Sequence, residues 1–370
     1  MHPRTFLIAL GCLAAIGGGA SALADTPGPA GLVPGFPNAE ILFTSSRDGD
    51  NEIFVMAIDG DDEHQLTHNN GLDSGAVWSP GFRWILFYSD RSGSIDIYRT
   101  DPIGKKQNQV TTDIADDADP AWSPDGSKIA FHSFRDGNAE IYVMDFDGTD
   151  AVRLTDSPGA DYDPSWSPDG SRLAFESDRD GDLEIHTMAI DGTDVEQLTD
   201  NDDADVDPVW SRDGTLILFA SDRDGNFNVW SMLSNDGTDL QRRTTNQQQQ
   251  FDPSWSGDGS LIAYTSHQDG NPEIYREGAD GSDVTRLTNN AASDTKPDWR
   301  NIQMGNANCL GGLDAVDASV ILQYGAALVP TLRCLWSAHT NFDLTVNAID
   351  AAIILQIVAG LIDPVHVPDP

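Results

Sequence analysis

Carboxylates that recur at a fixed distance before a tryptophan are the residues of this sequence most suited to binding chemistry. One set lies five residues before the tryptophans and a second set lies three residues before them, with Gln250 replacing one acid of the first set. If a symmetric fold placed the first set around one end of a channel, it would concentrate negative potential there and hold Ca²⁺ or attract a Lys- or Arg-bearing segment. We favour a structural alternative, in which each Asp accepts hydrogen bonds from N–H groups of its own turn. The first set comprises Asp73, Asp117, Asp161, Asp205 and Asp294, and the second comprises Asp119, Asp163, Asp207 and Asp252.

A second group of oxygen-bearing side chains stands at alternate positions near the C-terminus, directly before an apolar phrase with helical spacing. Alternate oxygens that lead into a helix are typical of an EF-hand-type calcium loop. The pattern occurs twice, and the first copy has Leu310 in place of a central carboxylate, so we expect it to bind Ca²⁺ more weakly. The better loop offers Asn341, Asp343, Thr345, Asn347 and Asp350, and the weaker loop offers Asn306, Asn308, Asp314 and Asp317.

The two loop-helix copies, whose helical phrases are 317–324 and 350–357, resemble a type I dockerin. Dockerins dock onto cohesin modules of scaffold proteins, so the resemblance implies a cohesin-like partner. The chain departs from the family at His339, where an Asp is usual, and at Leu344, where a Gly is usual. The alternative is a calcium-free pair of helices that caps the preceding domain. The positions that contact the partner in this family carry Ala315, Val316, Ala348 and Ile349, which implies an apolar contact surface.

The N-terminus has the pattern of a secretory signal peptide, with an apolar stretch at 6–16 and small residues that end in Ala22-Leu23-Ala24. We expect cleavage after Ala24 and a secreted, extracellular or periplasmic protein, in preference to a lipoprotein modified at Cys12. The apolar stretch is too short for a membrane span, and no later segment is apolar enough. Cys309 and Cys334 would remain after export, and in an oxidising compartment we expect them to form a disulfide.

The charge of the chain narrows the choice of partners. Sixty acidic residues face 21 basic ones, for a formal net charge of −39. Such a charge repels nucleic acid and anionic lipid, so we expect no nucleic-acid partner. Most of the Asp residues lie in Asp-Gly turns, and turn chemistry therefore explains most of the excess.

Six tryptophans at intervals of 44 or 45 residues mark six internal repeats, and these repeats are the elements that would position the acids. After each tryptophan come a turn, an apolar strand such as 129–131, a polar turn with Gly, a third strand such as 140–144, and a short fourth strand. Four short strands joined by Asp-Gly turns form one antiparallel sheet, which buries both faces only against neighbouring sheets. The sequence therefore predicts an all-β, six-bladed β-propeller of four-stranded blades. The tryptophans are Trp78, Trp122, Trp166, Trp210, Trp255 and Trp299.

The two ends of the repeat array are complementary. The array begins at Glu40 with a second strand, and it ends at 296–299 with an innermost strand that has no blade after it. The last strand can complete the first blade, so we predict a ring closed by backbone hydrogen bonds between the two ends.

The phrases 163–170 and 173–181 resemble the PD40, or WD40-like, repeat of TolB-type propellers, and the resemblance covers about residues 38–300. Proteins with this fold serve as binding platforms, as periplasmic Tol-system components, as gates on serine peptidases and as polysaccharide lyases. The resemblance thus implies a fold and leaves the function open.

Catalytic residues are not predicted. The G-x-S-x-G elbow of a serine peptidase is missing from the sequence, and His132, His186 and His267 fall at non-equivalent repeat positions. We favour a secreted non-catalytic binding or scaffold propeller that recognises a protein or glycan and is anchored by the dockerin-like module. The alternative is a carbohydrate-active propeller enzyme, a polysaccharide lyase or glycoside hydrolase, delivered to a polysaccharide-degrading complex.

The expected organisation combines the all-β propeller with a small α-helical module. It comprises a signal peptide at 1–24, a linker at 25–37, the propeller at 38–300, a linker at 301–305, the dockerin-like module at 306–363 and a tail at 364–370.

Overall fold

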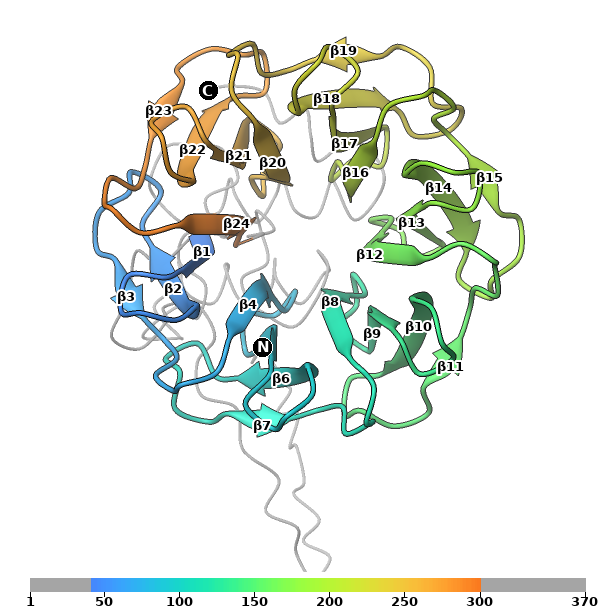
Figure 1. Ribbon diagram of the computed structural model, residues 1–370, viewed down its shortest axis with the longest axis horizontal. Helices are drawn as coiled ribbons and strands as arrows, with labels where there is room; N and C mark the ends of the chain where they lie inside the picture. The colour runs from blue at the N-terminus through green and yellow to red at the C-terminus, as the bar shows by residue number, and fades with distance from the viewer. Residues whose placement is uncertain (1–40, 301–370) are drawn as a thin grey trace, which may run out of the picture.

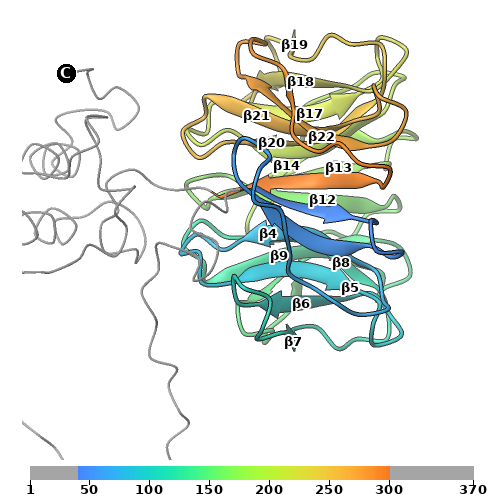
Figure 2. The same cartoon turned by 90° about the vertical axis from the view of Figure 1, so that its left-hand side faces the viewer.

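The computed structural model describes residues 41–300, which form 24 strands and no helix. The strands make six four-stranded antiparallel sheets arranged as blades around a central channel (Figure 1). Seen from the side, the strands run along the channel axis (Figure 2). The prediction of an all-β, six-bladed propeller with four-stranded blades is confirmed.

The blades are numbered here from the first strand of the described chain, and each is given from its innermost strand outward. Blade 1 consists of β24 (Asp294–Trp299), β1 (Ile41–Ser45), β2 (Glu52–Met56) and β3 (His64–Gln65). Blade 2 consists of β4 (Asp73–Trp78), β5 (Ile85–Ser89), β6 (Asp96–Thr100) and β7 (Asn108–Gln109). Blade 3 consists of β8 (Asp117–Trp122), β9 (Lys128–Ser133), β10 (Glu140–Asp145) and β11 (Val152–Arg153).

The remaining three blades repeat this arrangement. Blade 4 consists of β12 (Asp161–Trp166), β13 (Arg172–Ser177), β14 (Glu184–Ala189) and β15 (Glu196–Gln197). Blade 5 consists of β16 (Asp205–Trp210), β17 (Leu216–Ser221), β18 (Asn228–Leu233) and β19 (Gln241–Arg242). Blade 6 consists of β20 (Gln250–Trp255), β21 (Leu261–Ser266), β22 (Glu273–Gly278) and β23 (Thr285–Arg286).

Blade 1 closes the ring as predicted. Strand β24, from the end of the array, pairs with β1 through Ile41 opposite Trp299 and Ser45 opposite Asp294. The first and last described residues therefore meet at the end of the channel where the innermost strands finish. No other blade is built from two distant parts of the chain among the residues 41–300.

The apolar core lies between the blades. Because each sheet has a neighbour on both faces, the second strands are buried at nearly every position instead of alternating, and β1 is buried at all five. One interblade cluster joins Leu86 and Ile97 of blade 2 to Trp122 and Phe131 of blade 3. The repeat tryptophans thus pack against the preceding blade, and Trp166 also donates its indole N–H to a carbonyl there.

Each innermost strand carries an irregularity three residues before its tryptophan. The pairing register shifts at this point, as between Ala118 and Ala121 of β8. The residue inside the shift has a positive φ, which is 45° at Asp119 and 62° at Gly75. Asp tolerates this left-handed conformation better than most residues, and a bulge of this kind re-aims its side chain. The equivalent residues in the other blades are Asp163, Asp207, Asp252 and Lys296.

Several predictions from the sequence fall on residues outside the described range of 41–300. These are the signal peptide, both linkers, the dockerin-like module with its calcium loops and contact positions, and the disulfide between Cys309 and Cys334. Among residues 41–300, no helix could cross a membrane.

Candidate binding site in the central channel

A cavity of about 690 Å³ occupies the end of the channel where the innermost strands finish. Its walls combine the repeat tryptophans with the prolines of the turns that follow them, such as Pro80, Pro124 and Pro168. Phe82 and Arg212 also line it. The walls are therefore aromatic and apolar, and they belong to a rigid scaffold of paired strands.

A ring of bulge residues supplies much of the charge of the cavity, which Asp125, Arg212 and Asp298 also line. Four are acidic, one is basic and one is glycine: Asp119, Asp163, Asp207, Asp252, Lys296 and Gly75. Because the bulge recurs in every blade, these six positions are brought together although they come from distant parts of the chain. The second acidic set of the sequence analysis is thus the set that lines the channel.

Lys296 and Asp119 form the one ion pair between ring positions in the described part of the chain. Lys296 Nζ donates to Asp119 Oδ1 at 2.7 Å and lies 5.5 Å from the ring centre of Tyr88. Burial lowers the pKa of Lys296, but the charge of Asp119 and its neighbours outweighs burial and raises it well above its ordinary value. Burial likewise opposes ionisation of Asp119, and Lys296 and His132 together hold its pKa below the ordinary value.

Three carboxyl groups gather on the opposite side of the ring. One oxygen of each of Asp163, Glu176 and Asp207 lies within 4.8 Å of the others. Burial, followed by repulsion from Asp207, raises the pKa of Glu176 to about 8. Burial, followed by repulsion from Asp252, raises the pKa of Asp207 to about 7. This side of the cavity therefore holds protons near neutral pH that an incoming cation could displace.

Backbone and hydroxyl groups fix the carboxylates in place. The N–H of Asp207 donates to Glu176 Oε2, and the N–H of Asp252 donates to Asp207 Oδ2, each at 3.0 Å. The carboxylate of Asp252 in turn accepts a hydrogen bond at Oδ2 from Thr265 Oγ1, at 2.7 Å. The ring is thus preorganised, so little ordering is needed when a cation binds.

His132 contributes to the site from the second strand of blade 3, at the position that Glu176 occupies in blade 4. Its side chain is only 8% exposed, and Nδ1 lies 3.5 Å from Asp119 Oδ2 without a hydrogen bond among the described residues. Burial lowers its pKa despite the attraction of Asp119. His132 is therefore mostly neutral at pH 7.

The first acidic set lies elsewhere, at the starts of the innermost strands. All five carboxylates are fully buried, and none lines the cavity. Each is paired with an arginine from the turn between the second and third strands of its blade. Those arginines also lie over aromatic rings, as Arg135 does over Phe131 and Tyr142. The pairs are Arg91–Asp73, Arg135–Asp117, Arg179–Asp161, Arg223–Asp205 and Arg47–Asp294.

Arginine is thus the main partner of this first set, and it was missed in the sequence. The sequence does contain a sign of this pairing. The repeat that has Gln250 in place of the acid also has Gln268 in place of the arginine, and both exceptions occur in that repeat alone. Lys296, Glu176 and His132 were also missed, because each occurs in a single repeat and has no periodic signal.

Comparison with known proteins supports the fold. A family model described as PD40, TolB beta propeller domain, matches residues 21–118 and 116–236. The crystal structure of TolB from Acinetobacter baumannii is 22% identical with a TM-score of 0.63, covering 75% of this chain and 69% of that one. Putative TolB from Agrobacterium tumefaciens is 23% identical with a TM-score of 0.56, covering 68% and 88%.

The likeness extends beyond TolB itself. A chain of the nidogen/laminin complex is 12% identical with a TM-score of 0.59, covering 70% of this chain and 98% of that one. A search of the curated proteins found no match. At such identities the solved structures show that the fold is shared, and they carry no information about a shared ligand. The family match spans more than half of the sequence, and the chain belongs to the PD40, TolB beta propeller domain family.

Proposed function

We propose that this protein is a binding protein, and that its channel cavity takes up a cationic segment of a protein ligand. The observation that carries the proposal is the combination of tryptophan and proline walls with a ring that holds four aspartates and one lysine, and with Glu176 next to two of those aspartates. A Lys or Arg side chain fits this arrangement, because its apolar stem can lie along tryptophan and its charge can reach the carboxylates.

The size and the charges of the cavity favour a short protruding segment over a flat surface. About 690 Å³ accommodates a few side chains. Within residues 41–300, no Lys or Arg forms an ion pair with Asp163, Glu176 or Asp207, in contrast to Asp119, which pairs with Lys296. A ligand cation would therefore bind on the Glu176 side of the ring.

The proposal is tested with labelled hexa-arginine and hexa-lysine, with hexa-glutamate as the probe of opposite charge. We expect the basic peptides to bind, and the double variant Asp163→Asn/Asp207→Asn to bind them at least tenfold more weakly, measured by fluorescence anisotropy. The matched control is Asp200→Asn/Asp202→Asn, which makes the same two side-chain changes at exposed positions before β16. Its affinity should stay within about twofold of the wild type, because screening limits exposed charges.

Three outcomes oppose the proposal. Equal losses in both double variants would indicate only general attraction to an acidic protein. If no basic peptide binds, the proposal of a cationic ligand is wrong. Binding or cleavage of a polysaccharide that depends on Asp163 and Asp207 would favour the carbohydrate-active alternative.

We further propose that residues 306–363 anchor the propeller to a cohesin-like partner in a secreted or periplasmic assembly. The support is the duplicated pattern of oxygen side chains before an apolar helix, which suits Ca²⁺. Asp350→Ala should abolish Ca²⁺-dependent binding of the full chain to cohesin modules, and Asp317→Ala should weaken it less. If EDTA leaves capture by cohesin unchanged, or if cohesin does not bind, this anchoring role is wrong.

A further inference from the structure

A groove leads away from the channel cavity between blades 4 and 5, which lie side by side in Figure 1. Its volume is about 390 Å³, and it reaches the outermost strand of blade 4 at Glu196. The groove shares Pro168 and Trp210 with the cavity, so the two hollows are continuous. Trp210 is partly exposed, whereas the other five repeat tryptophans are buried. It therefore offers apolar surface at the point where the groove leaves the cavity.

The turn of blade 5 that borders the groove is one residue longer than its equivalents. Gly237 donates its N–H to the carbonyl of Leu233, four positions before it. The equivalent glycines of the other five blades donate to the carbonyl three positions before them, as Gly192 does to Ala189. The extra residue is Asn235, which lines the groove and accounts for the single interval of 45 residues in the array. The groove is thus bordered by a feature that no other blade has.

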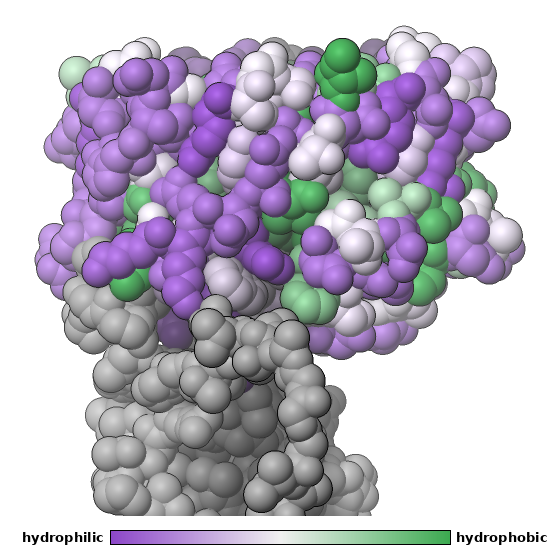
Figure 3. Space-filling model, turned by 90° about the horizontal axis from the view of Figure 1, so that it is seen from below, coloured by the Kyte–Doolittle hydropathy of each residue, from purple (hydrophilic) through white to green (hydrophobic). Residues whose placement is uncertain are grey.

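A small side chain keeps the groove open on this side. Hydrophobic residues are scattered over the mostly hydrophilic outer wall of the propeller (Figure 3). Three of the exposed ones, Ile58, Phe146 and Ile190, stand at the position that Ser234 occupies in blade 5. Because Ser234 lines the groove, a larger side chain at this position would fill part of it.

Elsewhere an arginine crosses the gap between two blades at the equivalent place. Arg99 of blade 2 donates to the carbonyl of Phe146 in blade 3 at 3.1 Å, and Arg243 of blade 5 donates to that of Ala279 in blade 6 at 3.0 Å. The arginine that lines the groove, Arg172, instead donates to a hydroxyl and a carbonyl of its own blade. Arg172 therefore does not bridge the gap between blades 4 and 5.

The charges along the groove favour a basic occupant. Asp169, Asp213 and Glu196 line it against the single Arg172. Hydrogen bonds from Ser171 hold the pKa of Asp169 below its ordinary value, so this carboxylate is ionised at neutral pH. The groove also opens next to the acidic side of the ring, because the three carboxyl groups of that side belong to blades 4 and 5.

We propose that the cationic segment leaves the cavity through this groove, so that a second basic side chain, next to the one in the ring, lies along Trp210 between blades 4 and 5. This inference rests on the proposed function and adds a second basic residue to its ligand. Tryptophan is the best aromatic partner for a cation, and the apolar stem of an arginine or lysine can lie along its ring.

The test uses the full-length protein and three probes: acetyl-Arg-amide, acetyl-Arg-Arg-Arg-amide and acetyl-Glu-Arg-Glu-amide. In competition with labelled hexa-arginine, the tri-arginine probe should bind at least about fivefold more tightly than the single arginine, which is the scale of an exposed cation–π contact. The probe with flanking glutamates should bind no more tightly than the single arginine. Ser234→Phe should abolish the gain from the additional arginines, because the new ring fills the groove. Ile190→Phe, at the equivalent exposed position of blade 4, is the matched control and should keep the gain.

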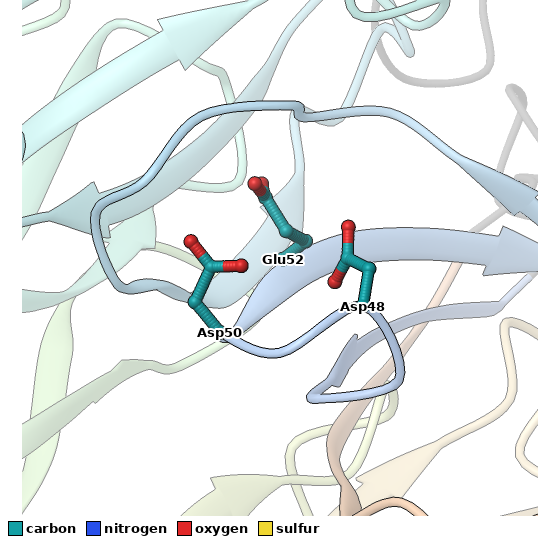
Figure 4. Close-up of side chains that lie close together, drawn as sticks. All are labelled: Asp48, Asp50 and Glu52. Atoms are coloured by element: carbon teal, nitrogen blue, oxygen red, sulfur yellow. The ribbon is translucent and has the colours of Figure 1, made fainter.

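Acidic groups away from the groove could also attract the additional charges of the tri-arginine probe. One such group is Asp48, Asp50 and Glu52, whose side chains converge in the turn between β1 and β2 (Figure 4). This turn lies at the end of the channel opposite the cavity, where the innermost strands begin. The variant Asp48→Asn/Asp50→Asn should therefore keep the whole gain in affinity. A gain that disappears in this variant and persists in Ser234→Phe would overturn the inference.

The outcomes separate this inference from the proposed function. If Ser234→Phe shows the same gain as the wild type, the groove is not used, and the channel remains the site of the single cation. If no basic probe binds the wild type, both the proposed function and this inference are wrong. Should Ser234→Phe fail to fold, deletion of Asn235 replaces it, since five blades already carry the shorter turn. An undiminished gain in that deletion variant would then overturn the inference.

Discussion

Lys296 Nζ donates to Asp119 Oδ1 at 2.7 Å, although the two residues are 177 positions apart and their blades are not adjacent. Blade 2 lies between them, and its bulge position is Gly75, where a Cβ atom would lie 2.5 Å from Tyr88 and 3.4 Å from Asp119 Oδ1. Glycine thus leaves the space that the lysine spans. The ion pair fills one side of the ring and leaves the acidic side open.

Lys296→Met should destabilise the fold, because it leaves Asp119 buried without its cation. We expect a loss of about 1–3 kcal/mol, the usual cost of an unpaired buried group. Chemical unfolding measures it, with the exposed Lys105→Met as control. The variant should also bind basic peptides more tightly. A variant as stable as the wild type would show that Lys296 does not stabilise the ring.

Buried carboxyl groups with raised pKa values should also give this protein an unusual pH dependence of stability. Burial is the largest cause that raises the pKa of Glu176 to about 8 and those of Glu52, Glu184 and Asp298 to about 7. The folded state therefore keeps protons that the unfolded chain releases above about pH 4.5. The stability that these protonated carboxyl groups contribute is therefore complete below about pH 4.5. It is lost as the pH rises through their pKa values in the folded state.

The melting temperature should consequently be highest near pH 5 and fall as the pH rises from there to about 8. Glu176→Gln should flatten the upper part of that fall, because the amide does not titrate. Calorimetry at constant ionic strength measures both effects. A melting temperature that is constant or rises over this range would contradict the assignment of raised pKa values.

Three ionisable side chains that meet between blades 4 and 5 have uncharged equivalents one repeat later in the same chain. Glu184 contacts Asp205, which accepts from Arg223 at 2.7 Å, and the three equivalent positions one repeat later carry amides. Asp205→Gln alone should cost about 3–5 kcal/mol, because it breaks a buried pair. The equivalent amides are Asn228, Gln250 and Gln268.

The triple variant Glu184→Asn/Asp205→Gln/Arg223→Gln should recover much of that loss, since it copies a combination that the fold already contains. Equilibrium unfolding of the single and triple variants gives the coupling energy. Additive losses would mean that the three side chains do not act as a unit.

Ring closure yields a prediction about solubility. Deleting 294–299 removes β24, so that β1 keeps β2 on one side and presents an open edge on the other. Open edges pair with other chains, and we expect oligomers on size-exclusion chromatography together with a lower melting temperature. A monomer with unchanged melting would show that β24 is not needed for closure.

The fold could be predicted because its signal repeats. Six copies of one phrase fixed the strand count of each blade, and the mismatch between the array's start at Glu40 and its end at Trp299 predicted closure. The site could be predicted only in part. Both acidic sets are periodic, but which set faces the channel depends on the bulge at residues such as Asp119, and the sequence shows no bulge directly.

Features that occur in a single repeat could not be predicted at all. Lys296 stands at a ring position where four blades carry aspartate, and Glu176 stands at a second-strand position where the other blades carry Thr, Tyr, His or Ala. Their effect depends on which blades face each other across the channel, which follows from closure geometry and not from spacing along the chain.

The central claim is that the acidic side of the channel is where a cation binds. The most direct measurement is the number of protons released when hexa-arginine binds at pH 7, obtained by titration calorimetry in two buffers of different ionisation enthalpy. Because Glu176 and Asp207 have pKa values of about 8 and about 7, an arriving cation should displace protons from them. The account predicts release of a substantial fraction of a proton per peptide, and a smaller release in Glu176→Gln/Asp207→Asn, in which Asp163 is the remaining carboxyl of the cluster with a raised pKa. Binding without proton release, or equal release in that variant, would contradict it.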